Sequence, residues 1–255
     1  MIQTILFDLD DTLLGNDMER FMPGYFSLIS KYARNLMEER HFMQELLICT
    51  QHVIENTDTQ LTNRDVFWQT FQQRNDLDPN ELEPFFHEFY RREFPKLQAV
   101  TEFRPTAVPL IQTCFDLGLQ VVIATNPLFP RIAIEERLAW AGVPVNEFDY
   151  ALVTTYENMH ATKPHTAYYE EILTAVNCPP QSALMIGDDW EMDIEPAAQL
   201  GMSCYWLPGQ ETELPDPALA TAAGTLENFY DLVQSSWLTT LPKGNESHVR
   251  TTPSA

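Results

Sequence analysis

The chain has 255 residues, 44% hydrophobic and 20% charged, which is typical of a globular protein with one large domain or one domain carrying an insertion. Its net charge of −22, with 15 basic residues spread along the chain, argues against nucleic acid or a membrane as partner. Four scattered cysteines without a CxxC pair, no basic leader and no run of 18 apolar residues predict a reduced, cytoplasmic protein.

The first predicted element is a buried strand at residues 2–7, and its apolar run ends abruptly at Asp8. From residue 17 to residue 99 the chain is poor in glycine and carries apolar residues at three- and four-residue steps, which predicts helices. Within this stretch Pro79 stands near a helix start, with Asp78 as its cap. Because the stretch shows no strand of comparable quality, we expect an all-helical insertion.

Beyond residue 103, continuous apolar strands alternate with helices. Strands are expected in LQVVIAT, YALVTT, ALMIGD and MSCYWLP, and helices in TAVPLIQTCFDLG, PRIAIEERLAWAG, TAYYEEILTAVN and DIEPAAQLG. This alternation predicts an α/β core with a Rossmann-like parallel sheet covered on both faces. The core would comprise residues 1–16 and 100–240 and the insertion residues 17–99. The polar residues 241–255 are expected to be a disordered tail.

Polar side chains follow four of these predicted strands. They are Asp8 and Asp10 after the first, Thr125 and Asn126 after the second, Lys163 beyond the third, and Asp188, Asp189 and Asp193 after the fourth. In open parallel α/β sheets, ligands bind beyond the carboxyl ends of the strands. The sequence therefore predicts one site that combines carboxylates, a hydroxyl–amide pair and an ammonium group.

The segments DLDDT, ATN, KP and GDDWEMD resemble, in order and spacing, the four motifs of the haloacid dehalogenase superfamily, which is dominated by phosphohydrolases. The helical insertion resembles the C1-type cap of that superfamily. The resemblance covers the whole predicted core. It implies a phosphatase that acts on a small phosphorylated metabolite.

The resemblance gives roles to the carboxylates, and each role has a physical reason. Asp8 would be the nucleophile that forms an aspartyl-phosphate, which divides a difficult hydrolysis into two easier steps. Asp10 would protonate the leaving alkoxide and then deprotonate water. Mg²⁺ prefers oxygen ligands and would be held by the side chains of Asp8 and Asp188 and by the main-chain carbonyl of Asp10.

The remaining motif residues would bind the phosphoryl group or support the metal site. Thr125 and Asn126 would donate hydrogen bonds to phosphoryl oxygens, and Lys163 would supply positive charge near Asp8. Thr12 would fix the first loop. Asp189 or Asp193 would orient the metal ligands or water, although Asp193 could instead favour a helix start.

The first motif departs from the usual pattern at two places, and the aromatic residues of the insertion have a structural explanation. Asp11 stands where the family most often has glycine, and LLGND differs from the usual continuation of the first motif. The aromatic residues at helical spacing in residues 67–90 are expected to form the insertion's own core rather than a substrate-binding pocket.

Three other functions compete with a Mg²⁺-dependent phosphatase. A haloacid dehalogenase would keep the nucleophile but generally has an aromatic residue where this chain has Asp10. A phosphomutase would return the phosphoryl group to its substrate, and the motifs leave that alternative open. A non-catalytic scaffold on the same fold should have lost at least one motif, and none is lost here.

Overall fold

A six-stranded parallel sheet forms the centre of the α/β part of the computed structural model, which describes residues 1–16, 18–209 and 214–241. Its strand order is β5-β4-β1-β6-β7-β8. The strands are β1 (Thr4–Phe7), β4 (Gln120–Ile123), β5 (Leu152–Val153), β6 (Ala183–Gly187), β7 (Ser203–Trp206) and β8 (Ala222–Ala223). The predicted α/β fold with a parallel sheet is therefore confirmed.

Helices cover both faces of this sheet, as the continuous apolar strands require. Successive residues of β1 belong to two different hydrophobic clusters, Ile5 and Phe7 to one and Leu6 to the other. The covering helices are α5 (Ala107–Asp116), α6 (Arg131–Trp140), α7 (Thr166–Ala175), α8 (Glu195–Gln199), α9 (Leu226–Gln234) and α10 (Trp237–Thr240). Two short turns, the 3₁₀-helix η2 (Pro180–Ser182) and the π-helix η3 (Trp190–Ile194), flank β6.

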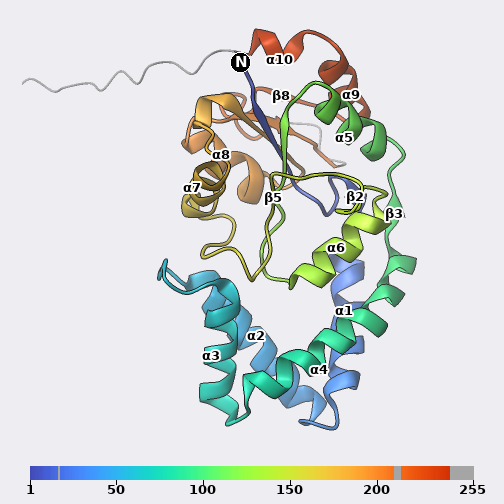
Figure 1. The fold of residues 1–255 in the computed structure, drawn as a ribbon, viewed down its shortest axis with the longest axis vertical. Coiled ribbons are helices and arrows are strands. Elements are labelled where there is room, and N and C mark those ends of the chain that lie inside the picture. Colours follow the sequence, from blue (N-terminus) through green and yellow to red (C-terminus); the bar gives the residue numbers. More distant parts are fainter. Residues whose placement is uncertain (17, 210–213, 242–255) are drawn as a thin grey trace, which may run out of the picture.

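Residues 18–100, called the helical segment below, form a separate group of helices beyond the sheet (Figure 1). They comprise α1 (Met18–Ala33), α2 (Glu39–Glu55), α3 (Asn63–Asn75), α4 (Pro79–Arg92) and the 3₁₀-helix η1 (Phe94–Val100). Asp78 caps α4 by accepting a hydrogen bond from Asn80, and Pro79 occupies the first turn, as predicted. The segment contains no strand among its described residues.

A two-stranded antiparallel ribbon joins the points where the chain leaves and re-enters the α/β part. It pairs β2 (Leu14–Gly15) with β3 (Glu102–Phe103). Gly15 is required here because a Cβ at this position would lie 2.9 Å from the Cβ of Glu102.

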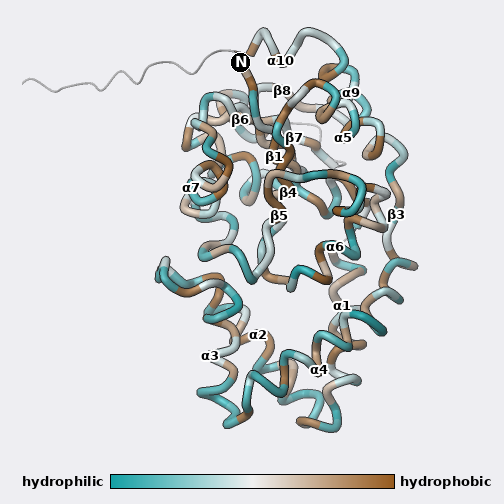
Figure 2. The backbone as a smooth tube through the Cα atoms, in the orientation of Figure 1, coloured by the Kyte–Doolittle hydropathy of each residue, from teal (hydrophilic) through white to brown (hydrophobic). Residues whose placement is uncertain are grey.

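Hydropathy follows this arrangement. Figure 2 shows hydrophobic stretches in the central strands β1 and β4, and mixed character along the helices of the helical segment. None of the helices in the described ranges combines the length and the apolar character that a bilayer-spanning segment needs. Of the predicted tail, Leu241 is buried in the hydrophobic core, and residues 242–255 lie outside the described ranges.

Candidate active site

Three parallel strands bring distant parts of the sequence to one edge of the sheet. Phe7 of β1 is in register with Ile123 of β4 and with Ile186 of β6. The residues that follow, including Asp8, Thr125 and Asp188, therefore lie beyond the same carboxyl edge. This edge faces the helical segment (Figure 1).

Lys163 bridges two carboxylates at the centre of this site. Its Nζ atom donates hydrogen bonds to Oδ1 of Asp8 at 2.7 Å and to Oδ1 of Asp193 at 2.5 Å. All three residues are buried, and Lys163 follows a loop beyond β5 while Asp193 belongs to η3. Lys163 and Pro164 are joined by a cis peptide bond. The site thus holds one ammonium group between two acids, which come from the segments after β1 and after β6.

Burial and mutual repulsion shift the pKa values of these groups. Burial raises the pKa of Asp8 well above its usual range, Lys163 opposes this shift, and the carboxylates of Asp193 and Asp188 add to it. Burial disfavours the charge of Lys163, but Asp193 and Asp8 outweigh it and raise the pKa of the lysine. Burial, followed by repulsion from Asp193, raises the pKa of Asp188 to about 7. The three carboxylates therefore carry more negative charge than the single ammonium of Lys163 compensates.

A divalent cation fits this cluster. Carboxylate oxygens of Asp8, Asp188 and Asp193 all lie within 4.8 Å of one another. These three acids face the single ammonium of Lys163, which leaves two negative charges that one divalent ion would neutralise. Oxygen donors are those that Mg²⁺ prefers. Thr12, which is buried, donates a hydrogen bond of 3.4 Å to Oδ1 of Asp188 and so holds one of these carboxylates.

The turn after β6 is shaped to place Asp193 in this cluster. Asp189 caps η3 by accepting hydrogen bonds from the backbone of Glu191 and Met192, and its own N–H donates to Oδ2 of Asp193. A Cβ on Gly187 would overlap the carboxylate of Asp193. Asp193 is therefore part of the acid cluster and not simply an acidic residue at a helix start.

Asp10 lies near the cluster but its carboxylate is held by two other residues. Asn16 donates a hydrogen bond of 2.7 Å to Oδ1, and Arg137 forms an ion pair with Oδ2. Arg137 comes from α6 and is almost completely buried, with its guanidinium carbon 4.7 Å from the centroid of the Phe129 ring. Neither Asn16 nor Arg137 was predicted from the sequence. The proton donor of the predicted mechanism therefore has a cationic partner.

The loop that carries Asp10 turns sharply. Asp11 has a φ of 54°, in the left-handed region that favours glycine and tolerates aspartate. Asp11 therefore occupies a backbone conformation that glycine adopts readily and that aspartate tolerates. Arg104 donates to the main-chain carbonyl of Thr12 at 3.0 Å and ties the loop to the chain just after β3.

Thr125 and Asn126 follow β4 at the same edge. Thr125 is buried, and its carbonyl accepts hydrogen bonds from Thr154 and Tyr168. Among the described residues, its hydroxyl has no hydrogen-bonding partner, so it is free to bind a ligand. The carboxamide oxygen of Asn126 is buried and likewise unpaired within the described ranges, and turning the amide over would present its NH₂ group there.

Known proteins resemble this chain in sequence. Haloacid dehalogenase-like hydrolase domain-containing protein 3 of Xenopus laevis is 32% identical over 101 residues, 40% of this chain and 39% of that relative. The alignment thus spans well under half of the relative's length. Glyceraldehyde 3-phosphate phosphatase of Pyrococcus abyssi is 24% identical over 216 residues, 81% of each chain.

Solved structures share the fold. A HAD phosphatase from Thermococcus onnurineus aligns with a TM-score of 0.58 and 20% identity, over 91% of this chain and 98% of its own. A 2-haloacid dehalogenase from Pseudomonas syringae pv. Tomato DC3000 aligns with a TM-score of 0.59 and 19% identity, over 93% and 100%. The two carry different activities in their names, so these likenesses support the fold alone.

The family model of the haloacid dehalogenase-like hydrolases matches residues 2–201, from the strand before Asp8 to the end of the helix after Asp193. This match confirms the predicted family and the expectation of a hydrolase. The chain belongs to the haloacid dehalogenase-like hydrolases.

Proposed function

We propose that the protein hydrolyses a small-molecule phosphate monoester with Mg²⁺, through an aspartyl-phosphate on Asp8. The observation that carries this proposal is the contact of Lys163 with both Asp8 and Asp193, beside Asp188 at the carboxyl edge of the sheet. Relatives named as glyceraldehyde 3-phosphate phosphatases support the substrate class. The presence of Asp10 favours phosphate chemistry over dehalogenation.

In the first step, a carboxylate oxygen of Asp8 attacks phosphorus and the bond to the leaving oxygen breaks. Lys163 contacts Asp8 at Oδ1, and within the described ranges Oδ2 has no hydrogen-bond donor, so Oδ2 is the available nucleophile. Thr125 and Asn126 bind phosphoryl oxygens through their side chains. Asp10 gives its proton to the leaving alkoxide, which becomes the alcohol product.

In the second step, Asp10 takes a proton from water, which attacks phosphorus and breaks its bond to Asp8. Inorganic phosphate leaves and Asp8 is restored as a carboxylate. Both steps require Asp10 to exchange a proton, and its two oxygens are already engaged by Asn16 and Arg137. Asp10 must therefore exchange its proton at an oxygen that also accepts a hydrogen bond from Asn16 or Arg137.

The metal would be held by the side chains of Asp8 and Asp188 and by the carbonyl of Asp10. When bound, the ion supplies charge that offsets the repulsion between the acidic cluster and a phosphate dianion. Asp193 would act mainly through Lys163, and Thr12 and Asp189 would keep Asp188 and Asp193 in place. The hydrogen bonds of Thr12 with Asp188, Lys163 with Asp193 and Asp189 with Asp193 support these roles.

Residues 17–99 would serve as a cap over this site, with residues 1–16 and 100–240 as the core. Support comes from the start of α3, where the side chain of Asn63 donates to the carbonyls of Pro127 and Ala161 at 3.2 Å. These two residues lie next to Asn126 and near Lys163. The helical segment is thus hydrogen-bonded to the loops that carry the proposed phosphate-binding residues.

Hydrolysis of a panel of phosphate esters, with and without Mg²⁺, tests the proposal. Asp8→Asn should abolish turnover, whereas Asp149→Asn, which changes an exposed aspartate outside the site, should leave it intact. Asp10→Asn should lose more activity on esters with poor leaving groups than on esters with good ones. Wild-type rates in Asp8→Asn would contradict the covalent mechanism.

The same assays separate the competing functions. Halide release from a 2-haloacid at a rate unaffected by chelation would indicate a dehalogenase. Transfer of the phosphoryl group back to the organic product, with little inorganic phosphate, would indicate a mutase. Absence of any turnover, in a protein that still binds phosphate esters, would indicate a non-catalytic scaffold.

A further inference from the structure

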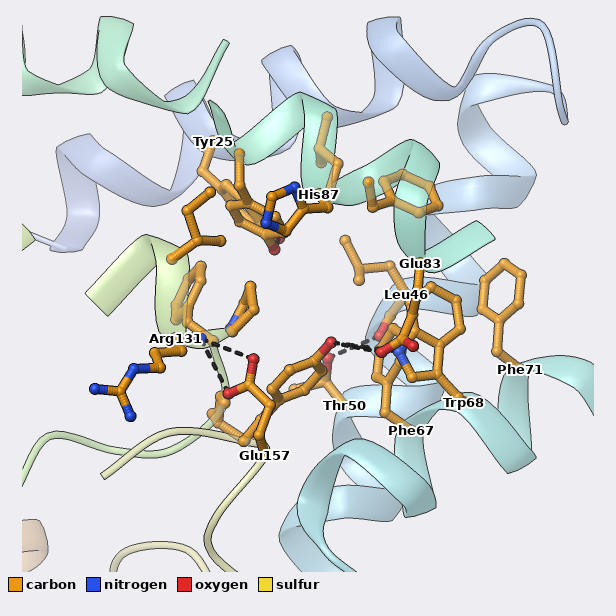
Figure 3. Close-up of a pocket in the computed structure, with 18 of the residues that line it drawn as sticks. Tyr25, Leu46, Thr50, Phe67, Trp68, Phe71, Glu83, His87, Arg131 and Glu157 are labelled. Atoms are coloured by element: carbon orange, nitrogen blue, oxygen red, sulfur yellow. Dashed lines mark hydrogen bonds between the residues drawn. The ribbon is translucent and has the colours of Figure 1, made fainter. Parts of the chain in front are cut away.

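A cavity of about 900 Å³ lies between the helical segment and the loops that follow β4 and β5. Its walls come from helices α1 to α4, from residues 128–135 and from Tyr156 and Glu157. Figure 3 shows Phe67 and Trp68 of α3 on one side of this space, with Tyr25 of α1 and Arg131 of α6 on others. A volume of this size accommodates a drug-sized organic group.

Aromatic side chains dominate the walls. Ten of the lining residues are Phe, Tyr or Trp. These rings also pack on one another, as in the stacked pair Phe42–Phe86 at 5.5 Å, so the expectation that residues 67–90 form the segment's own core describes one part of their role. The rings that line the cavity leave an apolar surface open to a ligand.

The charged groups of the walls provide little to bind a second anion. The acids Glu83, Glu135 and Glu157 outnumber the one cation among the lining residues, Arg131. Arg131 already pairs with Glu135 through its side chain and with Glu157 through its backbone N–H. Glu83 is paired with Arg64, which lies outside the walls. A carboxylate or a second phosphate in the cavity would therefore meet net negative charge.

The cavity adjoins the proposed proton donor. Phe129 lines the cavity three residues after Asn126, and the guanidinium of Arg137 lies over its ring while pairing with Asp10. One ring and one guanidinium group thus separate the cavity from the carboxylate that would protonate the leaving oxygen. The alcohol portion of an ester bound at Asp8 would have to extend past Phe129 to enter this space.

From this arrangement we infer that the substrates are phosphate monoesters of large, uncharged and mainly apolar alcohols, with the alcohol portion held in this cavity. The inference rests on the proposed phosphatase function. It differs from a preference for small, polar sugar phosphates, which would leave most of the cavity unfilled.

A homologous series of esters tests this inference. We expect kcat/KM to rise from ethyl to butyl, hexyl and octyl phosphate by about fourfold for each added methylene, until the cavity is filled. Octyl phosphate should exceed both glyceraldehyde 3-phosphate and 8-carboxyoctyl phosphate, which carries a terminal anion. A flat series, or a preference for the charged esters, would overturn the inference while leaving the phosphatase function standing.

A matched pair of variants locates the effect in the cavity. Leu47 lines it with 53% of its surface exposed, and Leu117, outside it, is 54% exposed. Leu47→Lys should lower the octyl to carboxyoctyl ratio of kcat/KM several-fold, because its ammonium attracts the terminal carboxylate. Leu117→Lys should leave the ratio unchanged. Equal ratios in both variants would place the alcohol elsewhere.

A binding measurement separates the two proposals. Calorimetric titration of Asp8→Asn with n-octylphosphonate should show binding with a negative heat-capacity change, the mark of apolar burial, and methylphosphonate should not. No heat-capacity difference between the two would overturn the inference. No hydrolysis of any ester by the wild-type protein would overturn the proposed function and the inference with it.

Discussion

The guanidinium group of Arg137 forms an ion pair with the carboxylate of Asp10 in the first loop of the candidate active site. The guanidinium is 1% exposed and comes from the buried face of α6, whereas the side chain of Asp10 is 16% exposed. The second terminal nitrogen of Arg137 is buried without a hydrogen-bond acceptor among the described residues. Asp10, the proposed proton donor, is thus the ion-pair partner of the buried guanidinium group of Arg137.

Removing the charge of Asp10 should therefore destabilise the fold as well as affect catalysis. Asp10→Asn leaves Arg137 buried without a counter-charge, and we expect the free energy of unfolding to fall by about 3–5 kcal/mol. The same change made in an Arg137→Met background should cost much less. Urea unfolding of the four proteins measures this coupling. Additive effects within about 0.5 kcal/mol would show that the pair is not energetically linked.

Substitution of Gly187 should disturb the cluster of Asp8, Asp188 and Asp193 without replacing any proposed metal ligand. In Gly187→Ala the new Cβ displaces Asp193 and hence Lys163. We expect a loss of about 1–3 kcal/mol in stability and a higher Mg²⁺ concentration for half-maximal activity. Gly209→Ala, at a position with open space, is the control. The idea fails if both variants require the same Mg²⁺ concentration as the wild type.

Mg²⁺ should stabilise the folded protein because it neutralises the cluster. At a concentration about 100 times its dissociation constant, the ion should add about 2.7 kcal/mol to the free energy of unfolding. Asp188→Asn removes one proposed ligand and should abolish most of this increment. Thermal unfolding with added Mg²⁺ or with chelator provides the measurement. A Tm that responds equally in wild type and variant would place the ion elsewhere.

The helical segment should lose stability in acid through Glu45. This buried carboxylate accepts hydrogen bonds from Arg74 at 2.6 and 2.9 Å, and the contact with Arg74 holds the pKa of Glu45 below its ordinary value. A lowered folded-state pKa gives stability that is complete above the ordinary value of 4.5 and is lost as the pH falls through the folded-state pKa.

Glu45→Gln tests this contribution. It should cost about 1–3 kcal/mol at pH 7, because hydrogen bonds to a charged group are replaced by weaker ones. The difference from the wild type should shrink as the pH is lowered through that window. Glu39→Gln, an exposed change on the same helix, serves as the comparison. A difference that stays constant with pH would mean that the ion pair is not the cause.

The positions of Asp8, Thr125 and Asp188 could be predicted because they follow long apolar strands. Continuous buried runs identify central strands of a parallel sheet, and the parallel direction brings their ends together. The fold class and the helical insertion were predictable for the same reason, since each depends on periodicity over many residues. Two-residue strands such as β2 and β3 carry no periodic signal, and the ribbon between them was missed.

Arg137 was missed although the sequence carried a signal for it. It stands four residues after Ala133 and three after Ile134, on the face of α6 that is otherwise apolar and buried. A charge at such a position requires a buried partner. Which carboxylate that partner is depends on packing between distant segments, and the sequence does not specify it. The cavity was missed similarly, because aromatic spacing on helices does not distinguish filled from open surfaces.

The ribbon of β2 and β3 also constrains how the protein can move. The described chain passes between the α/β part and the helical segment at this ribbon, and Asp10 itself forms a bridge to Leu14 of β2. Arg104, one residue beyond β3, donates a hydrogen bond to the main-chain carbonyl of Thr12. A hinge rotation of the helical segment about the ribbon therefore shifts the loop that bears Asp10. On the proposed function, a rotation that admitted an ester would therefore also move the group that protonates it.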